Sequence, residues 1–166
     1  MITVENSKPD KDAALKPPPV GAAFLVSQVG AHAALAFGER LSALGLKPHH
    51  AGILRMLGSN PGLTQQALSE LLGVFPSALV RFLDLLEEQQ LIERRDAPDD
   101  RRSYRLHLTR KGRSVLARIG EVTQELERDL FSALSAADTR VLTELLGRVV
   151  AQQQITPGVH PAYKQL

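Results

Sequence analysis

The sequence predicts a mainly α-helical protein that carries one small β-hairpin. Apolar residues recur at helical spacing over most of the chain, so helices dominate. Residues 91–109 instead hold two short strand-like runs, and Pro98-Asp99-Asp100 supplies a turn between them. Two helices separated by a short glycine-containing turn precede this hairpin. Helix, turn, helix and hairpin in this order are typical of a winged helix-turn-helix, in which the hairpin is the wing.

The composition excludes several classes of protein and site. The 166 residues fit one domain, and the formal net charge is only +2, so any basic surface must be local. The absence of cysteine excludes disulfides, thiol catalysis and thiolate metal sites. The five histidines show no helical i, i+4 pair, and the chain has neither a Gly-rich phosphate loop nor a Gly-x-Ser-x-Gly elbow. We therefore expect no metal, no cofactor and no enzymatic activity.

We expect a cytoplasmic protein with a single folded domain. No run of about 18 apolar residues predicts a membrane span, and the N-terminus lacks the apolar segment of a secretory signal. Residues 1–18 are polar, charged and rich in proline at their end, which predicts a disordered tail, and residues 156–166 are a second expected tail. The expected divisions are a domain over 19–155, a winged helix-turn-helix over 61–110, and dimerisation helices over 20–44 and 111–153.

The first predicted helix, residues 20–44, is apolar on nearly all sides. A helix of this kind is buried on several faces, and in so small a chain a second subunit is the expected cover. We therefore predict a helical homodimer built on this helix and the last two. The residues predicted at its interface are Phe24, Leu25, Val141, Leu145 and Val149.

The second and third helices are delimited by residues that cap or break helices. Residues 48–59 form the second predicted helix, which Asn60-Pro61-Gly62 ends. Thr64 suits the N-cap of the third helix, which reaches Leu72.

The fourth helix is predicted to begin at Pro76 and to reach about Gln90. Gly73 precedes it at a turn that favours positive φ. Apolar residues at positions i, i+3, i+4 and i+7 give this helix one core face, formed by Leu79, Phe82, Leu83 and Leu86.

A hairpin and two more helices complete the domain. Short strands are predicted over residues 91–95 and 103–109, the second with strict alternation of apolar and basic side chains. Helices follow over residues 111–134 and up to about residue 152. A Ser-x-x-Asp start signal at Ser135 introduces the last one.

The outer face of the fourth helix carries residues that can contact DNA bases. Ser77, Ala78, Val80 and Arg81 are placed opposite the core face. Recognition helices present their N-terminal outer residues to the major groove. Serine and arginine bind base edges or phosphates, and alanine and valine contact thymine methyl groups. The alternative is a generic exposed face with a few aliphatic side chains.

The hairpin turn combines acids and arginines. Asp100 lies two residues from Arg102, so its carboxylate can orient the guanidinium. An arginine held on a thin hairpin suits a narrow minor groove, where the negative potential is strongest. Further cations placed to contact phosphates are Arg101, Arg105, Arg110 and Lys111. Such contacts make affinity fall steeply with salt. An ordinary solvated hairpin is the alternative.

Residues 63–112 resemble the winged-helix core of the MarR family of bacterial transcription regulators. The family's wing pattern, Asp-x-Arg-Ser/Ala, an alternating strand and Leu-Thr-x-x-Gly, is matched between Asp100 and Gly112. Its run Leu-Gly-Val-x-Pro-Ser-x-Val-x-Arg-Leu-Val-Asp is largely matched from residue 72 to residue 84, and the long flanking helices extend the resemblance to residues 20–152. Phe75 departs from the pattern, since a polar cap is frequent there, and Leu85 replaces a frequent arginine.

The resemblance implies a homodimer that binds a pseudo-palindromic operator in double-stranded DNA, usually as a repressor, and responds to a small aromatic or anionic effector. The residues assigned to DNA are Thr64, Gln65, Pro76, Ser77, Ala78, Val80, Arg81, Asp100, Arg101, Arg102 and Arg105. His49 and His50 lie at the start of the second helix, in the region where the family's ligand pockets form, and are the expected effector contacts. For either histidine alone, exposure to water or a bond to the backbone is the alternative.

Two functions without DNA binding stay open on the sequence. One is a winged-helix protein-interaction module, which apolar Phe75 and Leu85 on or near the recognition face favour. The other is a dimeric small-molecule carrier that uses the cavity between the lobes.

Overall fold

A computed structural model of the chain describes residues 18–97, 100–156 and 158–160. The predicted N-terminal tail, residues 1–18, lies outside this part of the chain except for its last residue. Residues 98 and 99 of the predicted hairpin turn also lie outside it. For residues 97 and 100–103 the backbone is described and the side chains are not.

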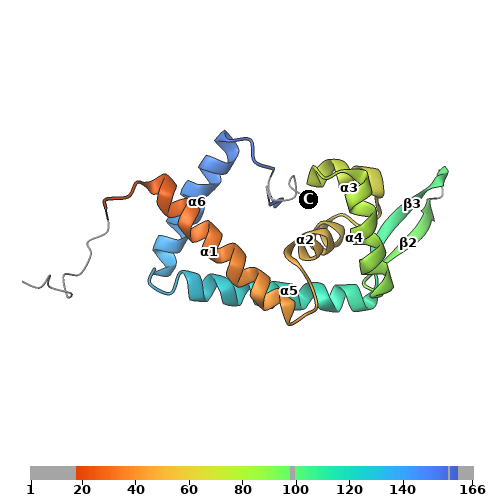
Figure 1. Cartoon of the computed structure of the whole chain (residues 1–166), viewed down its shortest axis with the longest axis horizontal. Helices are drawn as coiled ribbons and strands as arrows, with labels where there is room; N and C mark the ends of the chain where they lie inside the picture. Colours follow the sequence, from red (N-terminus) through yellow and green to blue (C-terminus); the bar gives the residue numbers. More distant parts are fainter. Residues whose placement is uncertain (1–17, 98–99, 157, 161–166) are drawn as a thin grey trace, which may run out of the picture.

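The described chain is mainly helical with a small antiparallel sheet, as predicted (Figure 1). The elements in chain order are α1 (Ala22–Ser42), α2 (Pro48–Ser59), β1 (Leu63–Thr64), α3 (Gln65–Leu72), α4 (Pro76–Glu88), β2 (Ile92–Ala97), β3 (Asp100–Leu108), α5 (Arg110–Leu130) and α6 (Ala136–Gln152). The strand order in the sheet is β1-β3-β2. The predicted helix, turn, helix and hairpin are therefore all present.

The turn between α3 and α4 is closed by local bonds that the sequence signals predict. The Thr64 hydroxyl oxygen accepts from the Ala67 amide at 3.1 Å and so caps α3. Gly73 takes a left-handed φ of 65° at the other end of α3. The buried Ser69 then bonds the turn twice, since its carbonyl accepts from the Val74 amide and its hydroxyl donates to the Val74 carbonyl at 2.7 Å.

The sheet is larger than the sequence predicts. Strand β1 pairs Leu63 with Leu106 and Thr64 with Arg105, which adds a third strand to the hairpin. Two residues are too short to show an alternating pattern, so no sequence signal marked this strand. Both hairpin strands also extend further toward the turn than predicted, to Ala97 and from Asp100.

One apolar core lies in the winged-helix lobe, by which we mean residues 48–108. Its buried side chains come from α2, α3, α4 and the sheet, with one residue each from α1 and α5 and three, Leu46, Val74 and Leu91, from connecting segments. The largest are Leu41, Ile53, Leu54, Leu57, Leu68, Leu72, Leu79, Leu83, Leu86, Ile92, Leu106 and Ile119. This core fixes how α3, α4 and the hairpin sit relative to one another.

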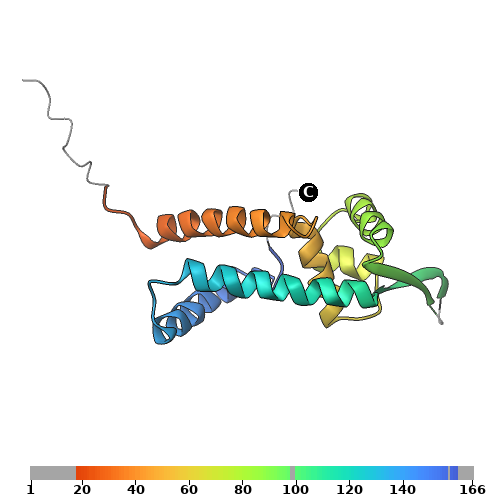
Figure 2. The same cartoon turned by 90° about the horizontal axis from the view of Figure 1, so that it is seen from below.

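The other end of the molecule, which we call the helical end, consists of α1, α6 and the second half of α5. Helix α1 runs beside α5 (Figure 2), and an ion pair joins Arg40 to Asp129. Leu41 is the one buried residue of α1, and α6 has none within the described chain. The helical end therefore has little core of its own.

The segment after α6 returns to the winged-helix lobe (Figure 1). Val159, within the expected C-terminal tail, is half-buried against the lobe core. A Cβ placed on Gly158 would lie 3.4 Å from the Met56 methyl carbon, so the backbone there is also close to α2. Residues 158–160 thus lie against the folded domain.

Candidate nucleic-acid interface

Helix α4 divides into a buried face and an exposed face. Leu79, Leu83 and Leu86 are fully buried, whereas Ser77 and Arg81 are exposed. Val80 is 37% exposed on the same outer side. The N-terminal part of α4 therefore presents a hydroxyl, an aliphatic group and a guanidinium to solvent, which is the arrangement of a helix that reads a major groove.

Ala78 does not belong to the exposed face, contrary to the prediction. Its exposed fraction is 4%, because it lies four residues before Phe82 and eight before Leu86. With about 3.6 residues per turn, these positions stack on one side of the helix. The buried face is thus wider than the i, i+3, i+4, i+7 pattern alone predicted, and Ala78 packs inside the lobe instead of facing bases.

The start of α4 has no side-chain cap. Phe75 occupies the N-cap position, makes no capping hydrogen bond and is 75% exposed, while Pro76 takes the first helical position. Proline there needs no hydrogen-bond partner for its nitrogen. An aromatic side chain therefore projects into solvent beside Ser77, as the sequence departure at this position suggested.

A hollow of about 840 Å³ lies between α3, the start of α4 and the wing. Its walls include Thr64, Gln65, Pro76, Tyr104 and Arg105. Of the predicted DNA contacts among them, two are partly engaged within the protein. The Thr64 hydroxyl caps α3, and the Arg105 guanidinium donates to the Gly62 carbonyl at 3.3 Å. These two are better placed to shape the surface than to extend far from it.

The predicted tip of the wing lies at the edge of the described chain. Asp100, Arg101 and Arg102 belong to strand β3, but their side chains lie outside the described part. The bracing of Arg102 by Asp100 therefore stays a prediction.

An ion-pair network that the sequence reasoning missed connects the wing to α4. Arg94 on β2 donates from Nη2 to Asp84 at 2.6 Å and from Nη1 to Glu87, both on α4. Its backbone amide also donates to Glu87 Oε1 at 3.3 Å. Asp84 and Glu87 are three residues apart on one helix face, a spacing that could have signalled a common partner. The partner itself was one arginine among several in the hairpin.

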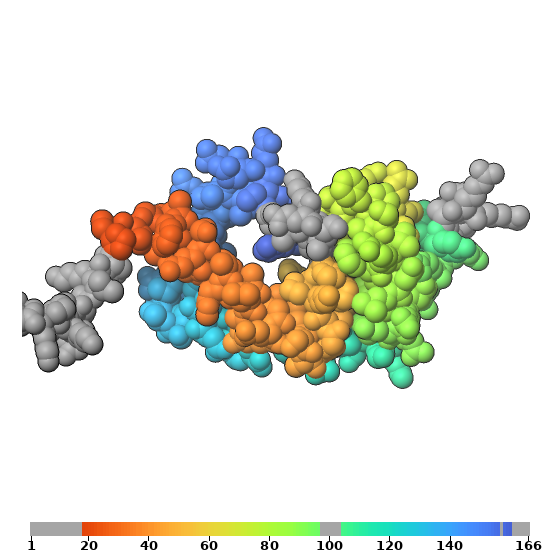
Figure 3. Space-filling view, viewed as in Figure 1, coloured from red at the N-terminus to blue at the C-terminus, as the bar shows by residue number. Residues whose placement is uncertain are grey.

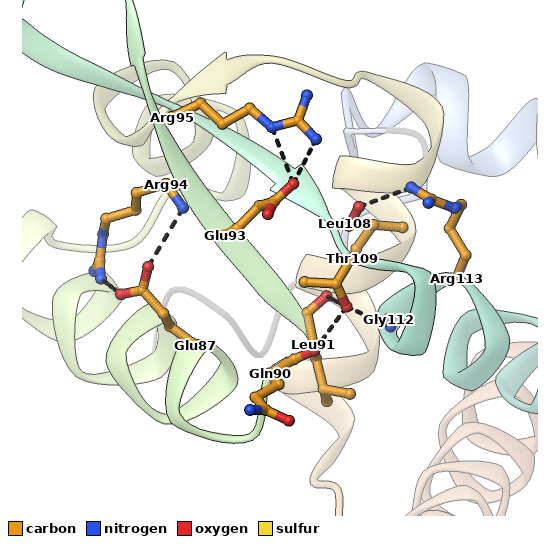
Figure 4. A network of polar contacts seen from close by, with 10 residues as sticks. All are labelled: Glu87, Gln90, Leu91, Glu93, Arg94, Arg95, Leu108, Thr109, Gly112 and Arg113. Carbon is orange, nitrogen blue, oxygen red and sulfur yellow. Dashed lines mark hydrogen bonds and ion pairs between the residues drawn. The ribbon is translucent and has the colours of Figure 1, made fainter.

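A second set of bonds joins α4, the hairpin and α5 (Figure 4). The Thr109 hydroxyl accepts from the Gly112 amide at 2.9 Å and donates to the Gln90 carbonyl at 2.6 Å. Arg113 donates to the Leu108 carbonyl at 2.8 Å. The start of α5 is therefore bonded both to the chain just after α4 and to the end of the wing.

Comparison with known proteins decides the family. The sequence pattern of the MarR family matches residues 44–103. The chain is 39% identical over 114 residues to a protein of Thauera aromatica named as the candidate transcriptional regulatory protein for the hcr operon, covering 69% of this chain and 69% of that one. The chain belongs to the MarR family. The resemblance stated from the sequence and the prediction of a transcriptional regulator are confirmed.

Solved MarR family structures share the fold. A cysteine-to-serine mutant of E. coli MarR in complex with operator DNA superposes with a TM-score of 0.66 at 26% identity, covering 77% of this chain and 92% of that one. A MarR family protein of Mycobacterium tuberculosis in complex with p-aminosalicylic acid gives a TM-score of 0.64 at 27% identity, covering 78% and 98%. The predicted winged helix-turn-helix fold is confirmed. None of the helices in the described ranges is long and apolar enough to cross a membrane.

In this MarR family protein, His49 and His50 lie at the start of α2 against Phe82 of α4. The His49 ring centroid is 4.3 Å from that of Phe82 and 4.2 Å from that of His50. His50 is buried, and its Nδ1 accepts from the Lys47 amide at 3.2 Å, so the backbone-bonded alternative describes it. Burial, followed by the charge of Lys47, lowers the pKa of His49.

The residues predicted at the dimer interface of this MarR family protein are exposed in the single chain. Phe24, Val141 and Val149 are 56%, 54% and 53% exposed, and Leu25 and Leu145 are 45% and 50% exposed. They lie on α1 and α6, which form much of the surface of the helical end (Figure 3). Isolated apolar residues are common on protein surfaces, but apolar side chains repeated along two helices need a cover.

Proposed function

We propose that this MarR family protein is a homodimeric regulator that binds a pseudo-palindromic operator in double-stranded DNA, as a repressor released or retained by a small aromatic or anionic effector. The observation that carries the proposal is the exposed start of α4, where Ser77, Val80 and Arg81 face solvent beside the wing. Two such helices in a dimer meet successive major grooves when they lie about one turn of DNA apart.

Two relatives support the parts of this proposal that go beyond the single chain. The E. coli MarR mutant was solved with operator DNA, and the M. tuberculosis protein with p-aminosalicylic acid, an aromatic acid. We propose that Ser77, Val80 and Arg81 contact bases, that Arg102 enters the minor groove beside Asp100, and that Arg101 contacts phosphate. Thr64, Gln65, Pro76 and Arg105 then border the DNA, and His49 and His50 border the effector.

The test is fluorescence anisotropy of the purified protein with labelled duplex from its own upstream intergenic DNA and with a scrambled duplex, over a salt series. We expect tight binding to the first duplex alone, weakening steeply as salt rises. Arg81→Ala should reduce that affinity by about 10- to 100-fold, the usual cost of losing a base-reading arginine. Arg128→Ala, at the far end of α5, should leave it unchanged.

A protein-interaction module is the second candidate, because exposed Phe75 gives the recognition face an apolar projection. Such a module would bind both duplexes equally weakly, and neither Arg81→Ala nor Arg102→Ala would alter that binding. If selection from random duplexes also yielded no preferred sequence, the DNA-binding proposal would be wrong.

A further inference from the structure

We infer that Arg94 is a positioning residue that sets the angle between the recognition helix and the wing, through what we call the Arg94 bridge: Arg94, Asp84 and Glu87. The inference rests on the proposed DNA-binding function. It assigns to Arg94 a role within the protein, in place of the direct phosphate contact that an arginine in a wing would suggest.

The geometry of the Arg94 bridge is that of a two-point attachment. The two terminal nitrogens of the guanidinium go to different carboxylates on successive turns of α4, Asp84 at 2.6 Å and Glu87. The planar, rigid fork of arginine holds both at a fixed separation. Glu87 also accepts from the Arg94 backbone amide, so one carboxylate holds both the main chain and the side chain of β2. Figure 4 shows Glu87 reaching from α4 to both groups.

Burial indicates that Arg94 is held in place. Its side chain is 21% exposed, against 57% for Asp84 and 39% for Glu87. The guanidinium is therefore partly removed from water, and its two carboxylate partners offset the cost of that desolvation. The neighbouring Arg95 differs in both respects. Its side chain is 59% exposed, and it pairs with Glu93 on its own strand. Exposed pairs of that kind contribute little, whereas a two-carboxylate network around one arginine is the exception.

The Arg94 bridge lies near the base of the wing, so a small change of angle there displaces the far end of the wing. Arg94 lies opposite Leu106, which pairs with Leu63 of β1 and is the buried residue of the hairpin nearest the turn among the side chains that the structure describes. Among the described residues, the recorded ion pairs between α4 and the wing all involve Arg94. Three more residues, 95–97, at about 3.3 Å each continue β2 beyond Arg94 for about 10 Å. A tilt of about 10° at the bridge would therefore displace the wing tip by about 2 Å, more than a recognition site tolerates.

The test is whether Glu87→Gln raises or lowers the affinity of the protein for operator DNA. Removing a negative charge near a DNA-binding surface ordinarily strengthens binding, because repulsion of phosphates falls. If Arg94 contacted DNA directly, Glu87→Gln would also free the Arg94 guanidinium from its ion pair to bind phosphate, and DNA binding would tighten further. If the Arg94 bridge positions the wing, Glu87→Gln should weaken binding by about 3- to 10-fold, a normal range for one coupled network.

The control is Glu88→Gln, on the next residue of α4. Glu88 is exposed and takes part in no ion pair or side-chain hydrogen bond recorded for the described chain. We expect the Glu88→Gln variant to bind operator DNA as tightly as the wild type or more tightly.

The dependence of affinity on salt should be the same for Glu87→Gln and the wild type, because no phosphate contact is lost. Asp84→Asn should act in the same direction but more weakly, since Asp84 is more exposed and does not hold the backbone amide. Affinity for Glu87→Gln equal to or above that of Glu88→Gln would overturn the inference.

A second readout needs no DNA, and so separates failure of this inference from failure of the proposed function. The chain has no cysteine, so Gln66→Cys on α3 and Asp96→Cys on β2 can carry a pair of spin labels without background. We expect a broader distance distribution between the labels with Glu87→Gln than with Glu88→Gln. Equal widths would show that the Arg94 bridge does not restrain the wing. If wild-type protein shows no operator binding but the widths differ, the proposed function fails and the positioning role stands.

Discussion

At the scale of single residues, Gly112 shows how closely the start of α5 approaches the chain between α4 and the wing. It lies in the first turn of α5, where its amide donates to the Thr109 hydroxyl. A Cβ at this position would lie 1.9 Å from the Leu91 carbonyl oxygen and 2.9 Å from its carbon. Those atoms are backbone, so they cannot move aside as the end of a side chain can. The Gly of the Leu-Thr-x-x-Gly pattern is therefore required by close approach of two chain segments.

Gly112→Ala should destabilise the protein by about 3 kcal/mol, because the added methyl group forces α5 away from Leu91. The control is Gly120→Ala on the same helix, where a Cβ meets nothing within 4 Å. That change should be neutral or stabilise by about 1 kcal/mol, since alanine favours helix. Chemical denaturation followed by circular dichroism measures both. A Gly112→Ala protein as stable as the wild type would show that the junction is looser than described.

At the scale of elements, the N-terminus of α2 depends on an uncharged histidine. His50 sits at the third helical position and accepts from the Lys47 amide through Nδ1, in place of the Glu or Gln of an ordinary capping box. Protonation of Nδ1 would remove this acceptor. Burial, then the nearby charges of His49 and Lys47, lowers the pKa of His50 to about 4. The helix start is thus tied to the protonation state of one ring.

This arrangement predicts a loss of stability in acid. The pKa of His50 is about 4 in the folded chain and 6.5 when unperturbed, so the unfolded chain binds more protons between these values. Stability should be complete above about pH 6.5 and fall by roughly 2 kcal/mol as the pH drops toward 4. Denaturation at fixed protein concentration over this pH range measures the change. His50→Gln keeps a capping acceptor without the titration and should show a shallower dependence; the same slope in both proteins would contradict the prediction.

At the scale of the whole molecule, the winged-helix lobe and the helical end differ in how much apolar surface each buries within the single chain. The winged-helix lobe has a continuous core, whereas α6 has no buried residue in the single chain. Val141, Leu145 and Val149 recur along α6 at helical spacing and are each at least half exposed. An amphipathic helix of this kind gains stability mainly by burying its apolar face. In the symmetric homodimer that we propose, a second copy of the chain would cover this face.

Leu145→Asp should therefore dissociate the dimer, because it would bury an unpaired charge at a cost of about 3 kcal/mol or more. Sedimentation velocity should find the wild type at twice the chain mass of 18.1 kDa and the variant at that mass. Thr143→Asp is the matched control on the same helix, at an exposed position outside the apolar stripe. Operator affinity should fall with Leu145→Asp alone, since one winged-helix lobe contacts one half-site. A wild-type protein that sediments as a monomer would rule out this use of α6.

The sequence by itself determined the helices and the hairpin of this protein and their order. Helical periodicity, the Thr64 cap, the start signal at Ser135 and the glycine at Gly73 act over one or two turns, so they can be recognised without any distant partner. The outer positions of Ser77, Val80 and Arg81 on α4 followed from the same local geometry. The family's motifs are equally local, which is why the helices and the hairpin of the winged helix-turn-helix could be predicted.

Tertiary structure alone decided the features that need a distant partner. Strand β1 exists because two residues pair with β3, more than forty positions away in the chain. Ala78 is buried because the packing of α4 in the lobe extends the buried face beyond the apolar stripe. Arg94 was one cation among many in the sequence, and its two carboxylate partners lie on a different element. Contacts between distant segments depend on how elements dock, and a one-dimensional pattern does not encode that docking.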